Sequence, residues 1–325
     1  MKKLKSKKVA IVLSVIPILF ITMFRKGIGT DYYNYMDILD GLKYNIPALY
    51  GWRKPEALFL VLCESIIKLG IDYQWLFIIS AFVYCAIVFY VIYSLSQNAS
   101  MSIFLLFGTT IYFASLNELR QHLGCALLLL AFKFMCEKKF KLFFLIVLVA
   151  GTIHVSCFLF AVVYLFYYIK IDPKKAIALV VVYVACLRIF INILYSIVGN
   201  TMYAVYLSRE VEAVGIMGIL IQVVIVTLVS LLYQDTPEYR MLYSIELVCL
   251  ALTFLQNSVP LIYRAKWNFY YPIILLLPMA VKRIRDARLR LVVNIMIVLC
   301  FMVYSYITVV VNKGYGVYPY QWIFG

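Results

Sequence analysis

Four polar clusters interrupt the apolar stretches of this 325-residue sequence, and they hold the residues best suited to chemistry. The first, FRKGIGTDYYNYMD (24–37), places Arg25 and Asp31 on either side of a glycine-rich turn. The second, WRKPEALF (52–59), carries Glu56 directly after a proline that can start a helix. Ordinary loop charges would explain the first cluster, and interaction with the N-terminus of a helix would explain Glu56.

The other two clusters place arginines at the ends of apolar segments. NELRQHLG (117–124) has Arg120 next to Gln121, and IYRAKWNFYYP has Arg264 and Lys266. Long basic side chains that reach the membrane surface would account for such positions. Arginine is costly near hydrocarbon, however, and its planar fork fits a phosphate group, so these residues favour anion binding.

Three side chains could accept a proton from a substrate hydroxyl, namely Asp31, Glu56 and His154. His154 lies in AGTIHVS (150–156) and is one of only two histidines, and a histidine satisfied by its neighbours is the ordinary explanation. Asp31 is the favoured base, because its glycine-rich turn can carry it towards an acceptor.

The arginines and carboxylates together suggest an anionic substrate that arrives through the membrane. Arginine clusters hold phosphates through charge-assisted hydrogen bonds. We expect at least two of Arg25, Arg120 and Arg264 to contact such a group, with Lys266 as a peripheral contact. A transporter for an anionic solute would show much the same residues, so the pattern leaves an enzyme and a transporter open.

The composition is that of a membrane protein. Apolar residues make up 65% of the chain and charged residues only 14%, whereas soluble domains are about a quarter charged. The net charge of +15 lies beside apolar segments, with no basic stripe that would indicate nucleic acid. The eight cysteines stand singly within apolar runs, so they indicate neither disulfides nor a metal site.

Loop charge predicts the topology, because lysine and arginine favour the cytoplasmic side. Five basic regions are placed inside, namely 2–8, 137–141, 170–175, the loop ending at Arg240, and 282–290. The result is an all-α polytopic membrane helix bundle of about eleven spans, with the N-terminus inside and the C-terminus outside. Residues 1–325 form a single membrane domain in this interpretation, and most polar chemistry collects on the outer face.

Two segments need special treatment in this topology. Residues 142–169 lie between two inside clusters, so they must form two short helices that turn at 150–156 and place His154 at the tip. The stretch 56–69 is short and charged. The number of membrane crossings before and after it requires both of its ends to lie on the same side of the membrane. We expect a re-entrant or interfacial helix there.

At these same clusters, the sequence resembles the EpsG family of exopolysaccharide and O-antigen polymerases, within the broader Wzy-type group. Gly124 and Cys125 stand where Ala-like residues would be expected, a small departure from the pattern. The matching stretches run in the family's order: FRKGIGTDYYNY (24–35), PEALF (55–59), NELRQHLGCALLLLA (117–131), VLVAGTIHVSCFLF (147–160), YRAKWNFYYPIILLLP (263–278) and YPYQWIF (318–324).

The resemblance implies a glycosyltransferase of the bacterial cytoplasmic membrane that acts on its outer face. Such polymerases transfer a growing glycan from undecaprenyl diphosphate onto the next lipid-linked repeat unit. No metal and no cofactor are expected; the partners are the undecaprenyl-diphosphate-linked oligosaccharide, the lipid bilayer and a chain-length regulator protein, with no nucleic acid. The expected catalytic residues are Asp31, Glu56 and His154, and the expected substrate-binding residues are Arg25, Tyr32, Tyr35, Arg120, Gln121, Arg264 and Lys266.

Two alternatives stay open beside the polymerase. An O-antigen ligase-like transferase would use a similar donor and a different acceptor. A polysaccharide flippase or anionic solute transporter would move its substrate without chemistry, although no internal repeat of the kind common in transporters is visible. The sugars of the repeat unit, the linkage, and the choice between O-antigen, capsule and exopolysaccharide cannot be read from the sequence.

Overall fold

The computed structural model describes residues 2–324 except 51–53, 202–203, 206, 209–210 and 212–214. Over these residues the chain is helical and contains no β-strand, so the predicted all-α class is confirmed. The sequence also predicts an outer loop at 199–212 followed by a span at 213–232, and parts of both lie outside the described residues. The chain packs as two compact units, residues 1–158 with 286–325, and residues 159–285.

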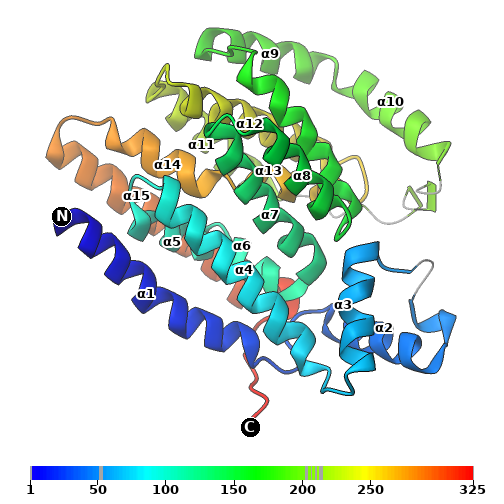
Figure 1. Ribbon diagram of the computed structural model, residues 1–325. Helices are drawn as coiled ribbons and strands as arrows, with labels where there is room; N and C mark the ends of the chain where they lie inside the picture. Colours follow the sequence, from blue (N-terminus) through cyan, green and yellow to red (C-terminus); the bar gives the residue numbers. More distant parts are fainter. Residues whose placement is uncertain are drawn as a thin grey trace. The chain divides into compact units, whose positions relative to one another are not determined.

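Unit 1 contains the first eight α-helices and returns at the end of the chain to add the last one (Figure 1). The central helix is α7, which packs on both α4 and α8, while α1 packs on α4 and α5. The elements are α1 (Lys2–Met23), α2 (Tyr32–Tyr44), η1 (Pro47–Tyr50), α3 (Ala57–Lys68), α4 (Gln74–Leu95), α5 (Ala99–Gly108), α6 (Ile111–Asn117), α7 (Leu119–Cys136), α8 (Phe140–Gly151), the start of the 3₁₀ helix η2 (Val155–Tyr167), α15 (Ala287–Tyr306), the π-helical turn η4 (Ile307–Val311) and η5 (Gly314–Gly316).

Unit 2 contains the rest of η2 and the helices that follow it. Within it, α12 is the central helix, because α9, α11, α13 and α14 all pack on it. The remaining elements are α9 (Pro173–Ala185), α10 (Leu187–Gly199), α11 (Ile216–Leu231), α12 (Pro237–Leu255), α13 (Ile262–Tyr270) and α14 (Ile273–Lys282).

Short polar side chains start several of these helices. The Asn98 side chain accepts a hydrogen bond from the backbone N–H of Met101 at the start of α5, and Asp286 accepts one from Leu289 at the start of α15. Asp172 and Thr236 cap α9 and α12 in the same way, each followed by a proline. These caps satisfy N–H groups that have no partner within the helix, so each of these helices begins at a defined residue.

Three helices are long and apolar enough to cross a membrane, among the described residues: α4, α7, and α15 continued by η4. Two more spans result if the bent pairs α5–α6 (52°) and α9–α10 (67°) each count as one. The other apolar helices are shorter, so length and composition alone do not reach the predicted eleven spans. That number, and the orientation of the termini, stay predictions.

The two segments with unusual predicted paths are helical as expected. The stretch 142–169 forms α8 and η2, and the chain turns between them at His154. The stretch 56–69 forms α3, which packs on α2 and α4 through an apolar core that includes Phe59 and Phe77. The turn at 150–156 and the separate short helix are therefore confirmed, whereas the depth of either in a membrane is not tested.

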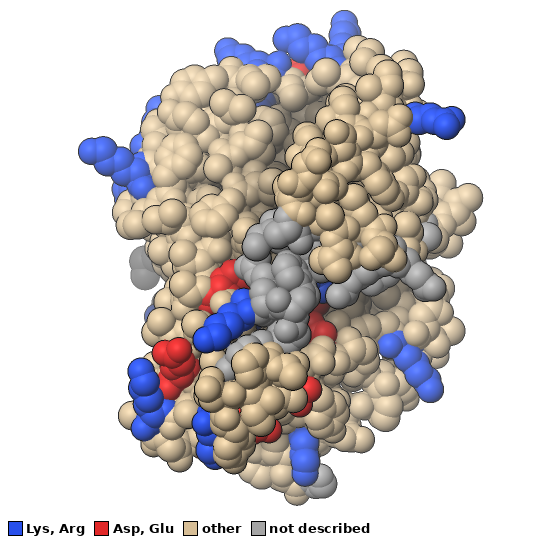
Figure 2. Space-filling model, turned by 90° about the vertical axis from the view of Figure 1, so that its right-hand side faces the viewer, with Lys and Arg blue, Asp and Glu red and all other residues tan. Residues whose placement is uncertain are grey.

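The surface has the character expected next to lipid. In the face shown by Figure 2, most atoms belong to residues other than Lys, Arg, Asp and Glu. In an apolar 18-residue stretch of α15 and η4, only 17% is buried within the protein, whereas 78% of the 18 residues of α7 is buried. In unit 1, α15 therefore offers an exposed apolar face, while α7 provides the protected centre on which a polar site can be built.

Candidate functional site

Arg25 directly follows α1 and is almost completely buried, with a residue exposure of 1%. Its guanidinium carbon lies 4.8 Å from the ring centre of Phe77 in α4, and its charge interacts electrostatically with the hydroxyl groups of Tyr112, Tyr35, Tyr320 and Tyr32. Burial lowers the pKa of Arg25 to about 10, so the guanidinium still carries its charge at neutral pH.

The buried charge of Arg25 has no anionic partner among the residues that the structure describes. Its Nε and Nη2 atoms lack any hydrogen-bond acceptor within the described part of the chain. An uncompensated buried cation is costly, and an anion bound beside it would offset that cost. The geometry at Arg25 therefore suits a phosphate-bearing ligand.

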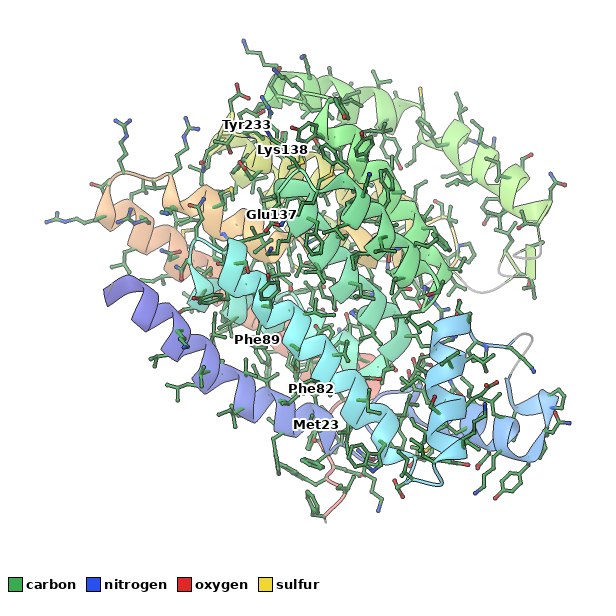
Figure 3. All side chains as sticks on the ribbon, in the orientation of Figure 1. Met23, Phe82, Phe89, Glu137, Lys138 and Tyr233 are labelled. Carbon is green, nitrogen blue, oxygen red and sulfur yellow. The ribbon has the colours of Figure 1, made fainter. Side chains whose placement is uncertain are left out.

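The C-terminal tail returns to the same point of the chain. Arg25 forms an antiparallel bridge with Trp322, the N–H of Lys26 donates to the carbonyl of Gln321 at 3.1 Å, and Ile323 donates to Phe24 at 3.1 Å. In Figure 3 the end of α1 is marked by Met23, two residues before Arg25. The first polar cluster (24–37) and the C-terminal stretch YPYQWIF (318–324) thus meet at Arg25.

Asp31 is held at the start of α2 by the junction between α6 and α7. The side-chain oxygen of Asn117 accepts hydrogen bonds from the Thr30 hydroxyl and from the N–H of Asp31, both at 2.9 Å. A Cβ on Gly29, where φ is +95°, would lie 2.7 Å from the carbonyl oxygen of Leu116. Glycine is therefore required for this close approach.

Arg120 and Glu56 form the centre of the polar network. Nη1 of Arg120 donates to Oε2 of Glu56 at 2.8 Å, and the backbone N–H of Val155 donates to Oε1 of the same carboxylate at 3.4 Å. The backbone N–H of Arg120 also reaches the Tyr35 hydroxyl at 3.4 Å. Glu56 stands at the N-cap position of α3, as an interaction with the helix N-terminus would require, but its side chain makes no cap hydrogen bond.

Gln121 links α7 to the turn that carries His154. Its amide nitrogen donates to the Ser156 hydroxyl at 3.1 Å, and that hydroxyl lies 2.9 Å from Nδ1 of His154. A Cβ on Gly124 would lie 2.5 Å from Sγ of Cys157. The departure of Gly124 from an Ala-like residue therefore has a physical reason, because α7 and the turn pack too closely for a methyl group.

Unit 1 brings together most of the residues that the sequence singled out. Glu56, Arg120, Gln121 and His154 belong to one hydrogen-bonded region, and Asp31 joins it through the α6–α7 junction. The carboxylate of Asp31 accepts a hydrogen bond from the Asn34 amide at 3.1 Å. This region lies where α1 ends and α4 begins, which is the end of unit 1 that the predicted topology places outside.

Tyr32 and Tyr35 are buried, with residue exposures of 7% and 4%, whereas a substrate-binding side chain is expected to be accessible. The ring of Tyr32 stacks on Phe77 with centroids 4.7 Å apart, and both tyrosines belong to the apolar core of α2, α3 and α4. They form part of the wall around Arg25. Their predicted role in substrate binding stays untested.

Arg264 and Lys266 belong to unit 2, on α13. Lys266 interacts electrostatically with Glu246 of α12, a buried carboxylate that accepts a hydrogen bond from Gln222 of α11. The structure therefore does not test whether these two basic residues act with Arg25 and Arg120.

Sequence reasoning missed several residues of this network. Asn117 and Ser156 were within the clusters quoted, but short polar side chains gave no signal of their own. Outside this network, Glu246 in unit 2 had a usable signal, because an acidic residue within an apolar segment is energetically costly and points to a function. Tyr112 and Tyr320, beside Arg25, were hidden among 28 tyrosines.

Comparison with known proteins identifies the family. Searches of curated proteins and of solved structures gave no match. The sequence model of the EpsG family matches residues 8–322, which is nearly the whole chain and includes the four polar clusters and the turn at His154. The chain therefore belongs to the EpsG family, whose members are polysaccharide polymerase-type proteins of the membrane.

Proposed function

We propose that this protein is a polysaccharide polymerase that transfers a growing glycan from undecaprenyl diphosphate onto the next lipid-linked repeat unit. The reaction would take place on the outer face of the bacterial cytoplasmic membrane. The observation that carries the proposal is the buried guanidinium of Arg25, which has two nitrogens without a protein partner at the end of the unit that also holds Arg120, Glu56 and Asp31.

Arg25 would bind the diphosphate of the donor. In the transfer, the bond between the anomeric carbon and the diphosphate oxygen breaks, and negative charge grows on the leaving group. A fixed cation in a site that excludes water stabilises such charge strongly. Arg25 meets both conditions, because it is buried and its backbone is held by the C-terminal tail.

Arg120 would bind the donor or position the site around it. One guanidinium nitrogen is taken by Glu56, while its Nε is buried without an acceptor. The ion pair fixes the side chain, and a fixed guanidinium loses little freedom when an anion arrives. Glu56 is then a positioning residue for Arg120, a different role from the base that the sequence left open.

Asp31 remains our proposed base. An acceptor hydroxyl must lose its proton as it forms the new bond to the anomeric carbon, and a carboxylate can take that proton. Asp31 is partly exposed, at the first turn of α2, with its backbone fixed by Asn117. His154 is buried and hydrogen-bonded to Ser156, which suits a role in holding the turn against α7.

The proposal is tested by the length of the surface glycan in a strain that lacks this gene. Loss of a polymerase should leave single repeat units attached to the acceptor, and the wild-type gene should restore long chains. Complete loss of surface glycan would contradict the proposal, because it would indicate a transporter that delivers the repeat unit. Long chains that accumulate on the lipid without reaching their final acceptor would instead indicate a ligase-like transferase.

A further inference from the structure

Unit 1 contains an apolar groove of about 630 Å³ next to the site. Its walls come from the end of α5 (Phe104, Phe107), from α6 (Phe113), and from α15 and η4 (Met302, Tyr306, Val309). The C-terminal tail closes it with Tyr320 and Trp322. The volume lies within the range of ligand pockets, roughly 300–1,000 Å³, and its lining is almost wholly apolar.

The groove shares its walls with the surroundings of Arg25. Tyr112 and Tyr320 line the groove and also interact electrostatically with the guanidinium of Arg25. Trp322 lines the groove and pairs its backbone with that of Arg25. Arg25 itself does not line the groove, but residues in contact with it do. A buried cation with two unpartnered nitrogens therefore lies behind one wall of an apolar groove, an arrangement that suits an anionic head attached to a hydrocarbon chain.

The Thr22 region keeps these walls in place. The Thr22 hydroxyl lies 3.0 Å from the Tyr112 hydroxyl, and the Tyr320 hydroxyl donates to the carbonyl of Ile21 at 2.5 Å. Both rings are thus tied to the last turn of α1 through their polar ends. Their apolar faces are left to line the groove, as is usual for buried tyrosines.

We infer that this groove holds the isoprenoid chain of the lipid-linked donor, with the first isoprene units beside Tyr112 and Tyr320 and the diphosphate at Arg25. The inference rests on the proposed function, since it supplies the lipid part of the same substrate. A single groove takes one hydrocarbon chain, whereas a glycerophospholipid brings two. The chain enters from the bilayer past α15, where Met302 and Tyr306 are 54% and 60% exposed.

Photocrosslinking on the wild-type protein tests the placement directly. An undecaprenyl diphosphate analogue with a photoreactive group near the diphosphate is bound to the purified protein in nanodiscs, and the labelled peptides are identified by mass spectrometry. We expect labels on α6, on residues 302–309 and on the tail. Labels only on other elements, or equal competition by phosphatidylglycerol at the same concentration, would overturn the inference.

A matched pair of variants on α15 adds a second test. Met302→Trp fills the groove, whereas Val303→Trp places the same ring on a neighbour that is 56% exposed and does not line it. We expect Met302→Trp to weaken binding of undecaprenyl diphosphate about tenfold, which is about 1.4 kcal/mol, and Val303→Trp to leave it unchanged. Equal affinities in two folded variants would contradict the groove.

These measurements separate the two proposals. If the groove binds the lipid but the reconstituted protein forms no polymer from lipid-linked repeat units, the proposed function fails and the groove stands. If polymer forms while both groove tests fail, the isoprenoid chain binds elsewhere and the polymerase stands.

Discussion

Nη1 of Arg120 lies 2.8 Å from Oε2 of Glu56, which joins the start of α7 to the start of α3 across 64 positions of the sequence. The pair is partly protected, with side-chain exposures of 27% for Arg120 and 12% for Glu56. The ion pair therefore ties α7, the helix that carries Arg120 and Gln121, to the start of α3.

A double-mutant cycle over Glu56→Gln and Arg120→Gln should show a coupling energy of about 1–3 kcal/mol, between the values for exposed and for fully buried pairs. Thermal unfolding in detergent measures each variant. Glu64→Gln on the same helix is the control, because Glu64 and Lys68 form an exposed pair at 3.8 Å and should contribute little. A coupling as small as that of the Glu64–Lys68 pair would contradict the positioning role of Glu56.

Gly124→Ala should disturb the turn that carries His154, because the new Cβ would lie 2.5 Å from Sγ of Cys157. Overpacking of this kind costs about 1–3 kcal/mol, and we expect a lower unfolding temperature with shorter glycans. Adding Cys157→Ala removes the sulfur and should restore part of both. Gly215→Ala is the matched control, since its Cβ would meet nothing within 4 Å. Equal stability of Gly124→Ala and Gly215→Ala would show that the packing is looser than described.

Asp31→Asn should abolish most chain extension while leaving donor binding intact, because it removes basicity and keeps the shape of the side chain. General-base help is worth roughly a hundred- to ten-thousand-fold in rate. Asp37→Asn, on the exposed side of the same helix, should have no effect. Normal extension by Asp31→Asn together with loss in Glu56→Gln or His154→Ala would move the base to one of those residues. Wild-type chain lengths in all three would exclude a base in this region.

Much of the local structure could be predicted from the sequence because it follows from charge and hydropathy. The turn at His154 and the separate helix after Pro55 were both predicted by placing the basic loops on the inner side and counting the membrane crossings between them. The partners could not be predicted, because they depend on tertiary packing. Nothing in the sequence shows that Glu56 meets Arg120, or that Asn117 fixes the backbone of Asp31.

The proposed outer location of the site can be tested by labelling. Cysteines introduced at Lys139, after α7, and at Tyr315, in the tail, should react from opposite sides of the membrane in a background without native cysteines. The basic region 137–141 favours the inside, and the tail follows the last apolar helix. Labelling of both positions from one side would refute the topology and the outer location together.

The most direct test of the central claim is polymerisation by the reconstituted protein with Arg25 replaced. Purified protein in nanodiscs is given lipid-linked repeat units, and glycan length is followed for Arg25→Lys beside the control Lys26→Gln, an exposed neighbour. Lysine keeps the charge but not the planar fork, so we predict a loss of about a hundredfold in extension rate, with Lys26→Gln unaffected. Normal polymerisation by Arg25→Lys, and likewise by Arg120→Lys and Arg264→Lys, would contradict binding of the donor diphosphate by these arginines.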